Sequence, residues 1–442
     1  MGAVGTERMD RAAEEGMARL LTPVGEACRR VLATCRALPP RSLRLADALG
    51  CVLAAPVVAT QAVPPFTSSA MDGYALRAAE TSEQPTTFRV VGELLAGSSF
   101  TGSLGAGEAV RIMTGAPLPA GADAVCEIER ADGAAGDASV TIACRLQLGE
   151  NVRRRGSDVD AGDEVLPAGT ALTPAALGLL ASVGRGEVLV HPRPSVGVLS
   201  TGDELVEGQG LGLGKIHDAN RPALLALLAQ SGFGAVDLGA VGDEPRDLAR
   251  ALAGGAERCD AVITSGGVSV GDHDMVKRVL AEVAGTMQWL QVAVKPAKPF
   301  AFGTLGAAAR PVFALPGNPV AAMVSFELFA RPALRLMAGF ERLERPSVLA
   351  VADEPMARQP DGKLHLVRVT AGIGDDGLVH VRSAGGQQSY QLRSMARANA
   401  LALLPDGCGV AAGGRVRAML LDAGELAALP ARPHMPNALG TM

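Results

Sequence analysis

The 442-residue sequence predicts an α/β multidomain protein, in which a central, mostly parallel α/β domain is joined to an N-terminal helical segment, an inserted β-domain and a C-terminal β-barrel. Three observations lead to this fold class. The chain is too long for one hydrophobic core, so about three or four domains are expected. After Pro194, short apolar runs alternate with amphipathic segments, which is typical of a parallel sheet covered by helices. Short β-like runs separated by turn residues stand on both sides of that region.

Two helix starts enclose the first β-rich region. Thr22-Pro23 and Thr173-Pro174 each place threonine at an expected N-cap and proline at the first helical position. The second helix is expected to end at Val183-Gly184. Between the two helices lie short β-like runs, at 88–91, 109–113 and 140–143. We therefore expect the helical pieces to flank an inserted β-domain.

Short apolar runs also predict the later strands. Four central strands are expected at 196–199, 235–238, 261–264 and 312–315, with helices such as 223–228 and 275–283 between them. Five further runs, at 348–351, 364–369, 378–381, 400–404 and 415–421, predict a small barrel or sandwich. The expected domains are a tail at 1–20, a discontinuous helical domain at 21–65 and 156–192, a β-domain at 66–155, the α/β domain at 193–342, the barrel at 343–425 and a tail at 426–442.

Composition argues against several classes of function. Lys and Arg number 41 against 46 Asp and Glu, for a net charge of −5, and aromatic residues make up 3%, so no nucleic-acid surface is expected. No apolar run reaches the ~18 residues needed to span a bilayer, and the N-terminus lacks the apolar core of a secretory signal. The seven cysteines are scattered without a C-x-x-C pair, which predicts reduced thiols and a cytoplasmic location.

Residues 260–274, DAVITSGGVSVGDHD, form the most informative stretch of the chain. An apolar run breaks into Ser265-Gly266-Gly267, and helical spacing resumes at Met275. A strand, a glycine-rich loop and a helix in this order bring backbone N–H groups against an anion. The alternative is an ordinary turn in which Asp272 or Asp274 caps the helix.

Glycine recurs after each expected central strand, in most cases together with a hydroxyl or carboxylate residue. The carboxyl ends of parallel strands meet at one edge of a sheet, so these residues are expected to line one crevice. The segments concerned are STGDE (200–204), GAVGDE (239–244), SGGVSVGDHD (265–274) and PGNP (316–319). The regular recurrence favours a binding crevice over a set of unrelated turns.

Two lysines add positive charge to the expected crevice. Lys295 and Lys298 stand in VAVKPAKPFAFG (292–303), where Pro296 and Pro299 are expected to hold them on a rigid extended segment with buried apolar flanks. Cations and amide donors suit phosphate or another oxyanion, while carboxylates suit Mg²⁺ that bridges phosphates. The crevice therefore predicts a phosphorylated ligand. The sequence contains neither the G-x-x-x-x-G-K-[ST] of P-loop NTPases nor a dinucleotide fingerprint after the first strand.

Three segments of the β-rich region carry further polar residues. FTSSAMDGYAL (66–76) contains Asp72, RIMTGAPLPAGADAV (111–125) contains Thr114, and GENVRRRGSDVDAGD (149–163) contains three arginines followed by Asp158. Each segment alone is typical of a turn or an exposed strand. Together they predict at least one functional contact in this domain.

These strings carry a resemblance to a known family. The chain resembles the molybdopterin molybdenumtransferases, the MoeA family, to which the E domain of gephyrin also belongs. The resemblance runs from about Thr22 to Leu421 and rests on eight strings that occur in the family's order. The strings are SAMDGYA (69–75), RIMTGA (111–116), RRRGSDV (153–159), STGDEL (200–205), TSGGVSVGDHD (264–274), KPAKPFAFG (295–303), LPGNPV (315–320) and SMARANA (394–400).

The resemblance implies an enzyme of molybdenum cofactor synthesis whose central domain binds molybdopterin. Such enzymes take adenylated molybdopterin and molybdate, insert molybdenum into the dithiolene and release AMP with the help of Mg²⁺. It also implies an elongated homodimer, in which the active site lies between the α/β domain of one subunit and the β-domain of the other. A molybdopterin adenylyltransferase is a further candidate partner.

Position in these motifs implies a role for individual residues. Roles in catalysis are implied for Asp72, Thr114, Asp158, Glu204, Asp243, Asp274 and Lys295, and of these Glu204, Asp243 and Asp274 would position Mg²⁺. Substrate binding is implied for Ser265, Gly266, Gly267, Ser269, Lys298, Pro316, Gly317, Asn318, Pro319, Arg368 and Ser394. Lys298, Arg368 and Ser394 stand where similar proteins hold molybdate, which fits because a dianionic oxyanion needs cations and hydroxyl donors.

The chain departs from the family pattern at three positions. Ala321 stands where many relatives have serine, Gln291 stands near the place of a common lysine, and His217 replaces a common tyrosine. Two other functions stay open. One is a molybdopterin adenylyltransferase, which shares the S-G-G domain but usually lacks the flanking domains, and the other is a scaffold that acts by binding, as gephyrin also does. The choice between molybdate and tungstate also stays open.

Overall fold

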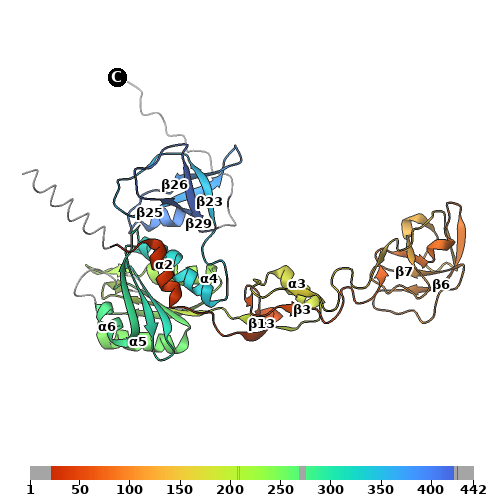
Figure 1. The fold of residues 1–442 in the computed structure, drawn as a ribbon, viewed down its shortest axis with the longest axis horizontal. Coiled ribbons are helices and arrows are strands. Elements are labelled where there is room, and N and C mark those ends of the chain that lie inside the picture. The colour runs from red at the N-terminus through yellow and green to blue at the C-terminus, as the bar shows by residue number, and fades with distance from the viewer. Residues whose placement is uncertain (1–20, 207, 209, 268–274, 423–425, 427–442) are drawn as a thin grey trace, which may run out of the picture. The chain divides into compact units, whose positions relative to one another are not determined.

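The fold is that of a computed structural model, which describes residues 21–206, 208, 210–267, 275–422 and 426. The chain divides into two compact units (Figure 1). One unit comprises residues 1–39 and 191–442, and the other comprises residues 40–190. We call them the sheet–barrel unit and the β-unit, and describe each by itself. Among the described residues, no helix is both long and apolar enough to cross a membrane.

A six-stranded, mostly parallel sheet forms the centre of the sheet–barrel unit, with the order β17-β14-β18-β22-β21-β19. β14 (Ser195–Thr201) runs parallel to β17 (Gly234–Val241) and to β18 (Ala261–Ser265), and β18 runs parallel to β22 (Arg310–Leu315). β21 (Pro299–Leu305) and β19 (Ala284–Gln291) extend the sheet in antiparallel fashion. The parallel arrangement expected for the central region is therefore confirmed.

Helices cover both faces of this sheet. α5 (Pro245–Arg258) and α6 (Met275–Val283) pack on one face, whereas α2 (Val24–Ala33), α4 (Asn220–Gln230) and α7 (Pro319–Ser325) pack on the other (Figure 1). The strands are buried on both faces because alternate side chains enter the two apolar clusters. For example, Val196 and Ile263 lie in the cluster with α4, while Leu199 and Val262 lie in the cluster with α5.

A buried ion pair lies where α7 continues toward the barrel. α7 leads into the π-helix η4 (Phe326–Ala330) and then into α8 (Arg331–Met337). The carboxylate of Glu327, whose side chain is 1% exposed, accepts two hydrogen bonds from Arg345, at 2.8 and 2.9 Å. Removing one partner of such a buried pair leaves an uncompensated charge, which typically costs ~3–5 kcal/mol.

Five strands of the same unit close into a barrel around a core of small apolar residues. β25 (Leu364–Ile373), β26 (Val379–Ser383), β23 (Ser347–Ala352), β29 (Arg415–Leu420) and β27 (Ala400–Leu404) pair in that order, and β27 pairs back with β25. β20 (Val294–Lys295) adds to β25 in parallel. The remaining elements of the unit are α9 (Leu392–Arg397), β24 (Met356–Ala357), β28 (Gly409–Val410), β15 (Leu205–Val206) and β16 (Ile216–His217).

The β-unit is built mainly on a six-stranded sheet with the order β8-β5-β7-β6-β10-β9. Its strands are β5 (Gly73–Leu76), β6 (Thr86–Leu94), β7 (Glu108–Ile112), β8 (Ala124–Glu127), β9 (Ala131–Asp132) and β10 (Ser139–Ile142). Smaller pairings involve β1 (Arg41–Arg44), β2 (Val52–Leu53), β3 (Val57–Val58), β4 (Ser68–Ser69), β11 (Val152–Arg153), β12 (Glu164–Leu166) and β13 (Glu187–His191). Three short 3₁₀ turns, η1 (Leu45–Asp47), η2 (Ala78–Glu80) and η3 (Ile128–Arg130), complete its strand connections.

The two expected helix starts have different outcomes. α3 (Pro174–Ser182) begins as predicted, because the Thr173 hydroxyl accepts a hydrogen bond from Ala176 N. The prediction for Thr22 is wrong: α2 begins at Val24 with Pro23 at the cap and no side-chain cap. The Thr22 backbone pairs instead with the strand-like segment around Val292, donating to Gln291 O at 2.7 Å. A tertiary pairing has replaced the local cap.

The segment that carries both lysines is not extended throughout, contrary to expectation. Val294–Lys295 and Pro299–Leu305 are strands, but the chain turns between them, with a cis Lys295-Pro296 bond and a positive φ of 85° at Ala297. The apolar flanks are buried as predicted, since Val292, Val294, Phe300 and Phe302 are at most 1% exposed. The lysines therefore stand on the two sides of a turn that is anchored by core residues.

Candidate functional site

Asn220 joins the ends of two central strands at the carboxyl edge of the sheet. Ser265 ends β18 and is 3% exposed, and its Oγ accepts a hydrogen bond from Asn220 Nδ2 at 2.7 Å. The same Nδ2 donates to Gly317 O at 2.7 Å, in the loop that follows β22. Ser265 and Gly317 were predicted site residues, and one amide brings them together. Asn220 was not predicted, although it stands in the G-x-I-x-D-x-N segment just before a helix.

The glycine that follows Ser265 is required by the backbone. Gly266 has a φ of +103°, and a Cβ there would lie 2.7 Å from Thr201 O, which is too close for any other residue. Gly266 N donates to Leu315 O at 3.1 Å, so the loop is held against the end of β22. The chain then leads into residues 268–274. Ser269, Asp272 and Asp274 lie there, outside the described residues.

Two predicted metal ligands follow neighbouring strands of the same edge. Glu204 follows β14 and Asp243 follows β17, and both are exposed. Asp203 ties the two strand ends together, because its Oδ1 accepts a hydrogen bond from Asp243 N at 3.0 Å. The Glu204 carboxylate lies over Gly202, where a Cβ would come within 2.3 Å of Oε2. Within the described ranges no group of three or more His, Cys, Asp or Glu forms a metal site, and the third predicted ligand lies outside them.

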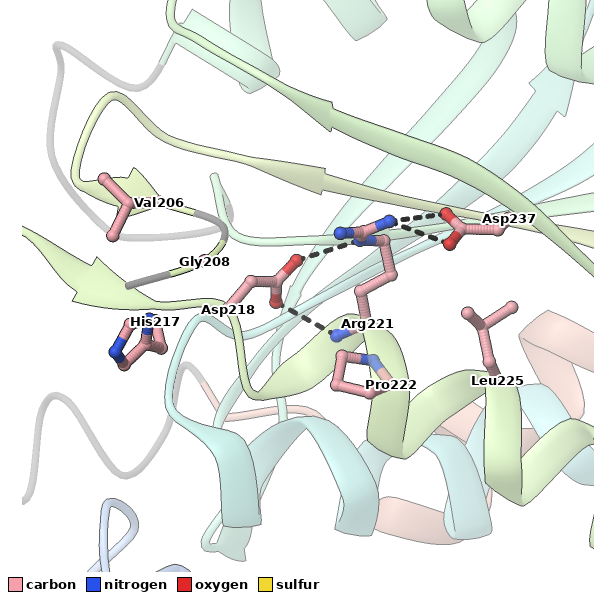
Figure 2. Close-up of a pocket in the computed structure, with 8 residues that line it drawn as sticks. All are labelled: Val206, Gly208, His217, Asp218, Arg221, Pro222, Leu225 and Asp237. Carbon is pink, nitrogen blue, oxygen red and sulfur yellow. Dashed lines mark hydrogen bonds and ion pairs between the residues drawn. The ribbon is translucent and has the colours of Figure 1, made fainter. Parts of the chain in front are cut away.

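A salt-bridged arginine fixes the start of the helix that carries Asn220. Asp218 accepts hydrogen bonds from Asn220 N, Arg221 N and Arg221 Nε, each at 3.1 Å. Arg221 Nη1 also donates to both carboxylate oxygens of Asp237 at 2.8 Å (Figure 2), and this hydrogen bonding lowers the pKa of Asp237. These residues line a pocket of about 280 Å³. The exposed ring of His217 stands at its rim.

Arg368 and Ser394 meet within the barrel side of the unit. The Arg368 side chain lies among the largest buried groups, and its Nε is 3.4 Å from Ser394 Oγ. Its Nη2 donates to Gly386 O at 3.0 Å and to Gln388 O at 3.1 Å. Burial lowers the pKa of Arg368 to about 10, so the guanidinium stays cationic at neutral pH. A buried guanidinium is a strong hydrogen-bond donor to an anion, and the Ser394 hydroxyl beside it can donate as well.

The lysine segment and Arg368 line one pocket of about 440 Å³. Lys295 and Pro296 form part of its wall, and Arg358, His365 and Arg368 of the barrel form another part. Lys298 is half-buried and is not among the lining residues. The P-G-N-P loop is tied to the barrel nearby, because Val320 N donates to Ser389 O at 3.1 Å. Of the departures from the family pattern, Ala321 is buried in α7 and Gln291 pairs with Pro299 at the end of β19.

The three polar segments of the β-unit converge on one another. β4 pairs with β11 in antiparallel fashion, and Gly115 N donates to Ser69 O at 2.9 Å, so segments 66–76, 111–125 and 149–163 meet. The Asp72 carboxylate accepts two hydrogen bonds, both at 2.7 Å, from the backbone N and the hydroxyl of Thr114. These bonds lower the pKa of Asp72 and keep it ionised at neutral pH. Asp158 is exposed, and its backbone N donates to Val63 O at 3.0 Å.

The chain therefore holds two sets of polar groups suited to different chemistry. The sheet–barrel unit presents a glycine loop, buried hydroxyls, a buried arginine and exposed carboxylates. The β-unit presents an ionised carboxylate with a hydroxyl beside it. Sequence reasoning missed Asn220 and Arg221, whose signal was the D-x-N-R string directly before a helical pattern.

Three family models match most of the chain. Residues 22–184 match the MoeA N-terminal region (domain I and II), residues 197–336 match a probable molybdopterin binding domain, and residues 350–421 match the MoeA C-terminal region (domain IV). Together these three regions cover most of the described residues.

Individual relatives agree with this match. The chain is 38% identical over 363 residues to a molybdopterin molybdenumtransferase of Haemophilus influenzae, which covers 82% of this chain and 89% of the relative. It is 39% identical over 401 residues to molybdopterin molybdenumtransferase 2 of Mycobacterium tuberculosis, with coverage of 88% and 97%. A crystal structure of the molybdopterin biosynthesis moeA protein from Pyrococcus horikoshii OT3 matches with a TM-score of 0.73 at 26% identity, over 90% of this chain and 100% of that one. The chain therefore belongs to the MoeA family of molybdopterin molybdenumtransferases.

Proposed function

We propose that this protein inserts molybdenum into molybdopterin during cofactor synthesis, with adenylated molybdopterin and molybdate as substrates and AMP as a product. The observation that carries the proposal is the double hydrogen bond of Asn220 to Ser265 and Gly317, which shapes a glycine-lined edge beside exposed carboxylates. Family membership supports the reaction class. The proposal assigns the phosphate groups of the substrate to this edge, where Gly266 and Gly267 allow a close approach of backbone N–H groups.

We assign the second substrate, molybdate, to the basic groups near the barrel. Arg368 and Ser394 would hold the oxyanion, since a buried cation and a hydroxyl complement a dianion. Lys298 would add charge from the lysine turn, and Lys295 lines the adjoining pocket. Ala321 offers no hydroxyl at the start of α7, so these groups must supply the contacts to the oxyanion.

Magnesium fits the chemistry of the exposed carboxylates. Glu204 and Asp243 follow adjacent strands and are tied together through Asp203, and carboxylate oxygens are the ligands that Mg²⁺ prefers. We propose that they hold Mg²⁺ together with Asp274, which lies outside the described residues. Bound Mg²⁺ would neutralise charge on the phosphates of the adenylate. The residues of the chain orient the phosphoanhydride and keep the two substrates at a fixed separation.

We also propose a cytoplasmic homodimer with a shared active site. The predicted catalytic residues Asp72, Thr114 and Asp158 belong to the β-unit, whereas Glu204, Asp243 and Lys295 belong to the other unit. Placing the β-unit of one subunit over the carboxyl edge of the central sheet of its partner would bring these two sets of residues together. Phe66 and Met71, which are 44% and 38% exposed, precede Asp72 in the same segment and suit such a contact. A molybdopterin adenylyltransferase that delivers the adenylated substrate is a candidate transient partner.

Release of AMP tests the proposed function directly. Purified protein is incubated with adenylated molybdopterin, Mg²⁺ and molybdate, and AMP is quantified by chromatography with molybdate present or withheld. We expect release that depends on molybdate. Asp243→Asn should abolish it while leaving the melting temperature unchanged, because Asp243 is exposed. Molybdate-independent AMP release, or none from the wild type, would reject the proposal in favour of the adenylyltransferase or scaffold functions.

The β-unit needs a separate test. Asp72→Asn keeps the shape of the carboxylate but removes its charge, and we expect turnover to fall by about 100-fold or more, the usual range for a lost catalytic polar group. Thr114→Val removes the hydroxyl donor to Asp72 and should reduce turnover less, because Thr114 N still donates at 2.7 Å. If Asp72→Asn matched the wild type, the assignment of the β-unit to the active site would be wrong.

A further inference from the structure

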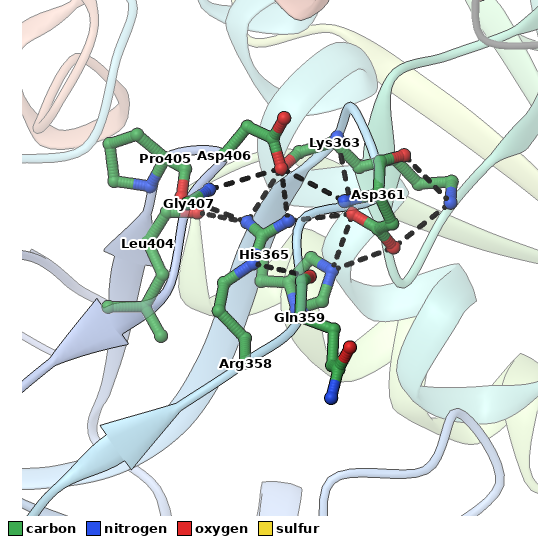
Figure 3. Close-up of polar contacts among 9 residues, drawn as sticks. All are labelled: Arg358, Gln359, Asp361, Lys363, His365, Leu404, Pro405, Asp406 and Gly407. Carbon is green, nitrogen blue, oxygen red and sulfur yellow. Dashed lines mark hydrogen bonds and ion pairs between the residues drawn. The ribbon is translucent and has the colours of Figure 1, made fainter. Parts of the chain in front are cut away.

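A cluster of charged side chains holds one wall of the pocket that Lys295 lines. The cluster consists of Arg358, Asp361, Lys363, His365 and Asp406, and we call it the pocket-side cluster (Figure 3). Arg358, Asp361 and His365 themselves line the pocket of about 440 Å³, together with Lys295 and Arg368. None of the predicted functions assigned a role to Asp361.

Asp361 is the centre of this cluster. Its carboxylate accepts a hydrogen bond from Arg358 Nη2 at 2.7 Å and one from Lys363 Nζ at 3.0 Å. His365 Nε2 lies 3.1 Å from both of its oxygens. The backbone N of Asp361 donates to Asp406 Oδ1 at 3.0 Å. One carboxylate therefore joins three cationic or basic side chains at the start of β25.

Arg358 connects the same carboxylate to the neighbouring strand. Its side chain is 3% exposed and donates to Lys363 O, Leu404 O and Pro405 O at 2.8 to 3.0 Å, and to Asp406 Oδ1 at 2.8 Å. Leu404 ends β27, which pairs with β25 opposite His365. The start of β25 is thus fixed to β27 by side chains as well as by the backbone ladder.

The position of Lys295 depends on this strand start. β20 pairs in parallel with β25 through only two residue pairs, Val294 with Leu364 and Lys295 with His365. Leu364 N donates to Ala293 O at 2.9 Å. Arg368, the proposed oxyanion ligand, lies three residues after His365 on β25. The two pairs with β20 involve the first two residues of β25, and Arg368 lies later on the same strand. A shift of those first residues would therefore displace Lys295 relative to Arg368.

We propose that Asp361 is a positioning residue for the oxyanion site, which acts through Lys295 by holding the first residues of β25 in register with β20. The inference rests on the proposed function, because it takes Lys295 and Arg368 as groups that attract molybdate. Asp361 also pairs with Arg358, Lys363 and His365, so these side chains do not compete with Lys295 and Arg368 for the anion. The residue touches neither substrate in this account.

The turn-side cluster at the other end of β25 provides a matched control. Asp353, Asp376, His380 and Arg382 form it, and Asp376 stands in the turn between β25 and β26. Asp376 lies 3.0 Å from His380 Nε2, so it also pairs a carboxylate with a histidine. Asp376→Asn therefore removes the same kind of interaction without touching the lysine segment.

The test measures the KM for molybdate and kcat in the AMP-release assay, and molybdate binding by equilibrium dialysis. For Asp361→Asn we expect the KM and the dissociation constant for molybdate to rise about tenfold, the usual lower range for a supporting hydrogen bond. Because Lys295 is also a predicted catalytic residue, kcat at saturating molybdate should fall as well, but by a smaller factor than the KM rises. Asp361→Glu should restore part of the affinity, and Asp376→Asn should change neither value. Arg358 keeps Asp406 and three carbonyl acceptors, so the variant should remain folded, which a thermal melt verifies.

A double-mutant cycle tests whether Asp361 acts through Lys295. If Asp361 acts through Lys295, the double variant D361N/K295A should bind molybdate no more weakly than Lys295→Ala alone. Additive losses, an unchanged KM in Asp361→Asn, or an equal loss in Asp376→Asn would each overturn the inference while leaving the wild-type activity, and so the proposed function, intact. A wild-type protein that neither turns over nor binds molybdate would reject the proposed function and the inference together.

Discussion

The two ends of β25 each carry a histidine that contacts an aspartate, but in different electrostatic settings. At its start, in the pocket-side cluster, one carboxylate, Asp361, serves Arg358, Lys363 and His365. At its end, in the turn-side cluster, two carboxylates surround one histidine, because Asp353 Oδ1 lies 2.5 Å from His380 Nδ1 and Asp376 lies by the other ring nitrogen. The first cluster has two fixed cations, Arg358 and Lys363, for its two carboxylates, Asp361 and Asp406, and lies beside a pocket. The second has one fixed cation, Arg382, for its two carboxylates.

The pKa values of the two histidines shift in opposite directions. Burial lowers the pKa of His365, and Arg358 and Lys295 lower it further, which together outweigh the hydrogen bond with Asp361. The hydrogen bonds with Asp353 and Asp376 raise the pKa of His380. A histidine–aspartate contact therefore does not determine the charge of the histidine by itself. The surrounding burial and the count of neighbouring charges decide it.

Stability should show the largest contrast between the clusters. Arg358→Ala removes a guanidinium that is 3% exposed and leaves three carbonyl oxygens without this donor, so we expect the unfolding free energy to fall by about 2–4 kcal/mol. Arg382→Ala removes a side chain that is 29% exposed and should cost about 1 kcal/mol or less. Urea unfolding of both variants measures the two losses. Equal losses would mean that burial does not separate the clusters.

Acid sensitivity should report on Asp361. Burial alone would raise its pKa, but the hydrogen bonds from His365 and Lys363 outweigh burial and lower the pKa to about 2, from an ordinary value of 3.8. A carboxyl whose pKa is depressed on folding stabilises the protein above its unfolded pKa, and this stabilisation is lost as the pH falls from about 4 to about 2. After discounting for solvent, the loss should be about 1–2 kcal/mol.

Asp361→Asn provides the check on that assignment. Unfolding free energy measured from pH 5 to pH 2 should decline less steeply in the variant than in wild type. The Asp406→Asn variant, which removes the other carboxylate that contacts Arg358, is the control. A wild-type acid limb that Asp361→Asn leaves unchanged would argue against a strongly stabilised carboxylate.

The histidines can be compared directly by NMR titration of their ring protons. We expect His365 to titrate below its ordinary value of 6.5 and His380 above it. Asp353→Asn removes a partner of His380 and should bring its pKa down toward 6.5. Asp361→Asn removes the contact that favours protonated His365 and should lower that pKa further. Titration of both rings at the same pH would contradict the proposed contrast.

The smallest expected effect is the pH dependence of stability that arises from His380. Its raised pKa means that the protonated ring stabilises the fold below pH 6.5, and this contribution is lost as the pH rises through the folded pKa. Because Asp376 is half exposed and the other side chains of the cluster are partly exposed, the contribution should be below about 1 kcal/mol. The difference in unfolding free energy between wild type and His380→Gln should shrink as the pH is raised from 6 to 9.

Much of the architecture could be predicted from short-range pattern. The four parallel strands of the central sheet follow from apolar runs bounded by glycine, and each expected run lies within the strand that the structure contains. The threonine–proline start of α3 was also predicted correctly, since the cap depends on residues three apart. The same signal failed at Thr22, because its backbone is engaged by a segment 270 residues away.

The sequence predicted several residues of the candidate site but not the contacts between them. Ser265, Gly317, Arg368 and Ser394 were expected to matter. That Asn220 joins the first two, and that Arg368 lies beside Ser394, follows only from contacts between segments far apart in the chain. Asn220 was missed because an asparagine before a helix is usually a local cap.

The sequence by itself determined the periodicity of the strands and helices, the glycines at the strand ends and the family to which the chain is similar, because these depend on a few neighbouring residues or on ordered motifs. The tertiary structure alone decided which charges are buried and which partners they meet. His365 and His380 illustrate the physical reason: each stands on a strand near an aspartate, yet desolvation and the charges brought by distant segments move their pKa values in opposite directions.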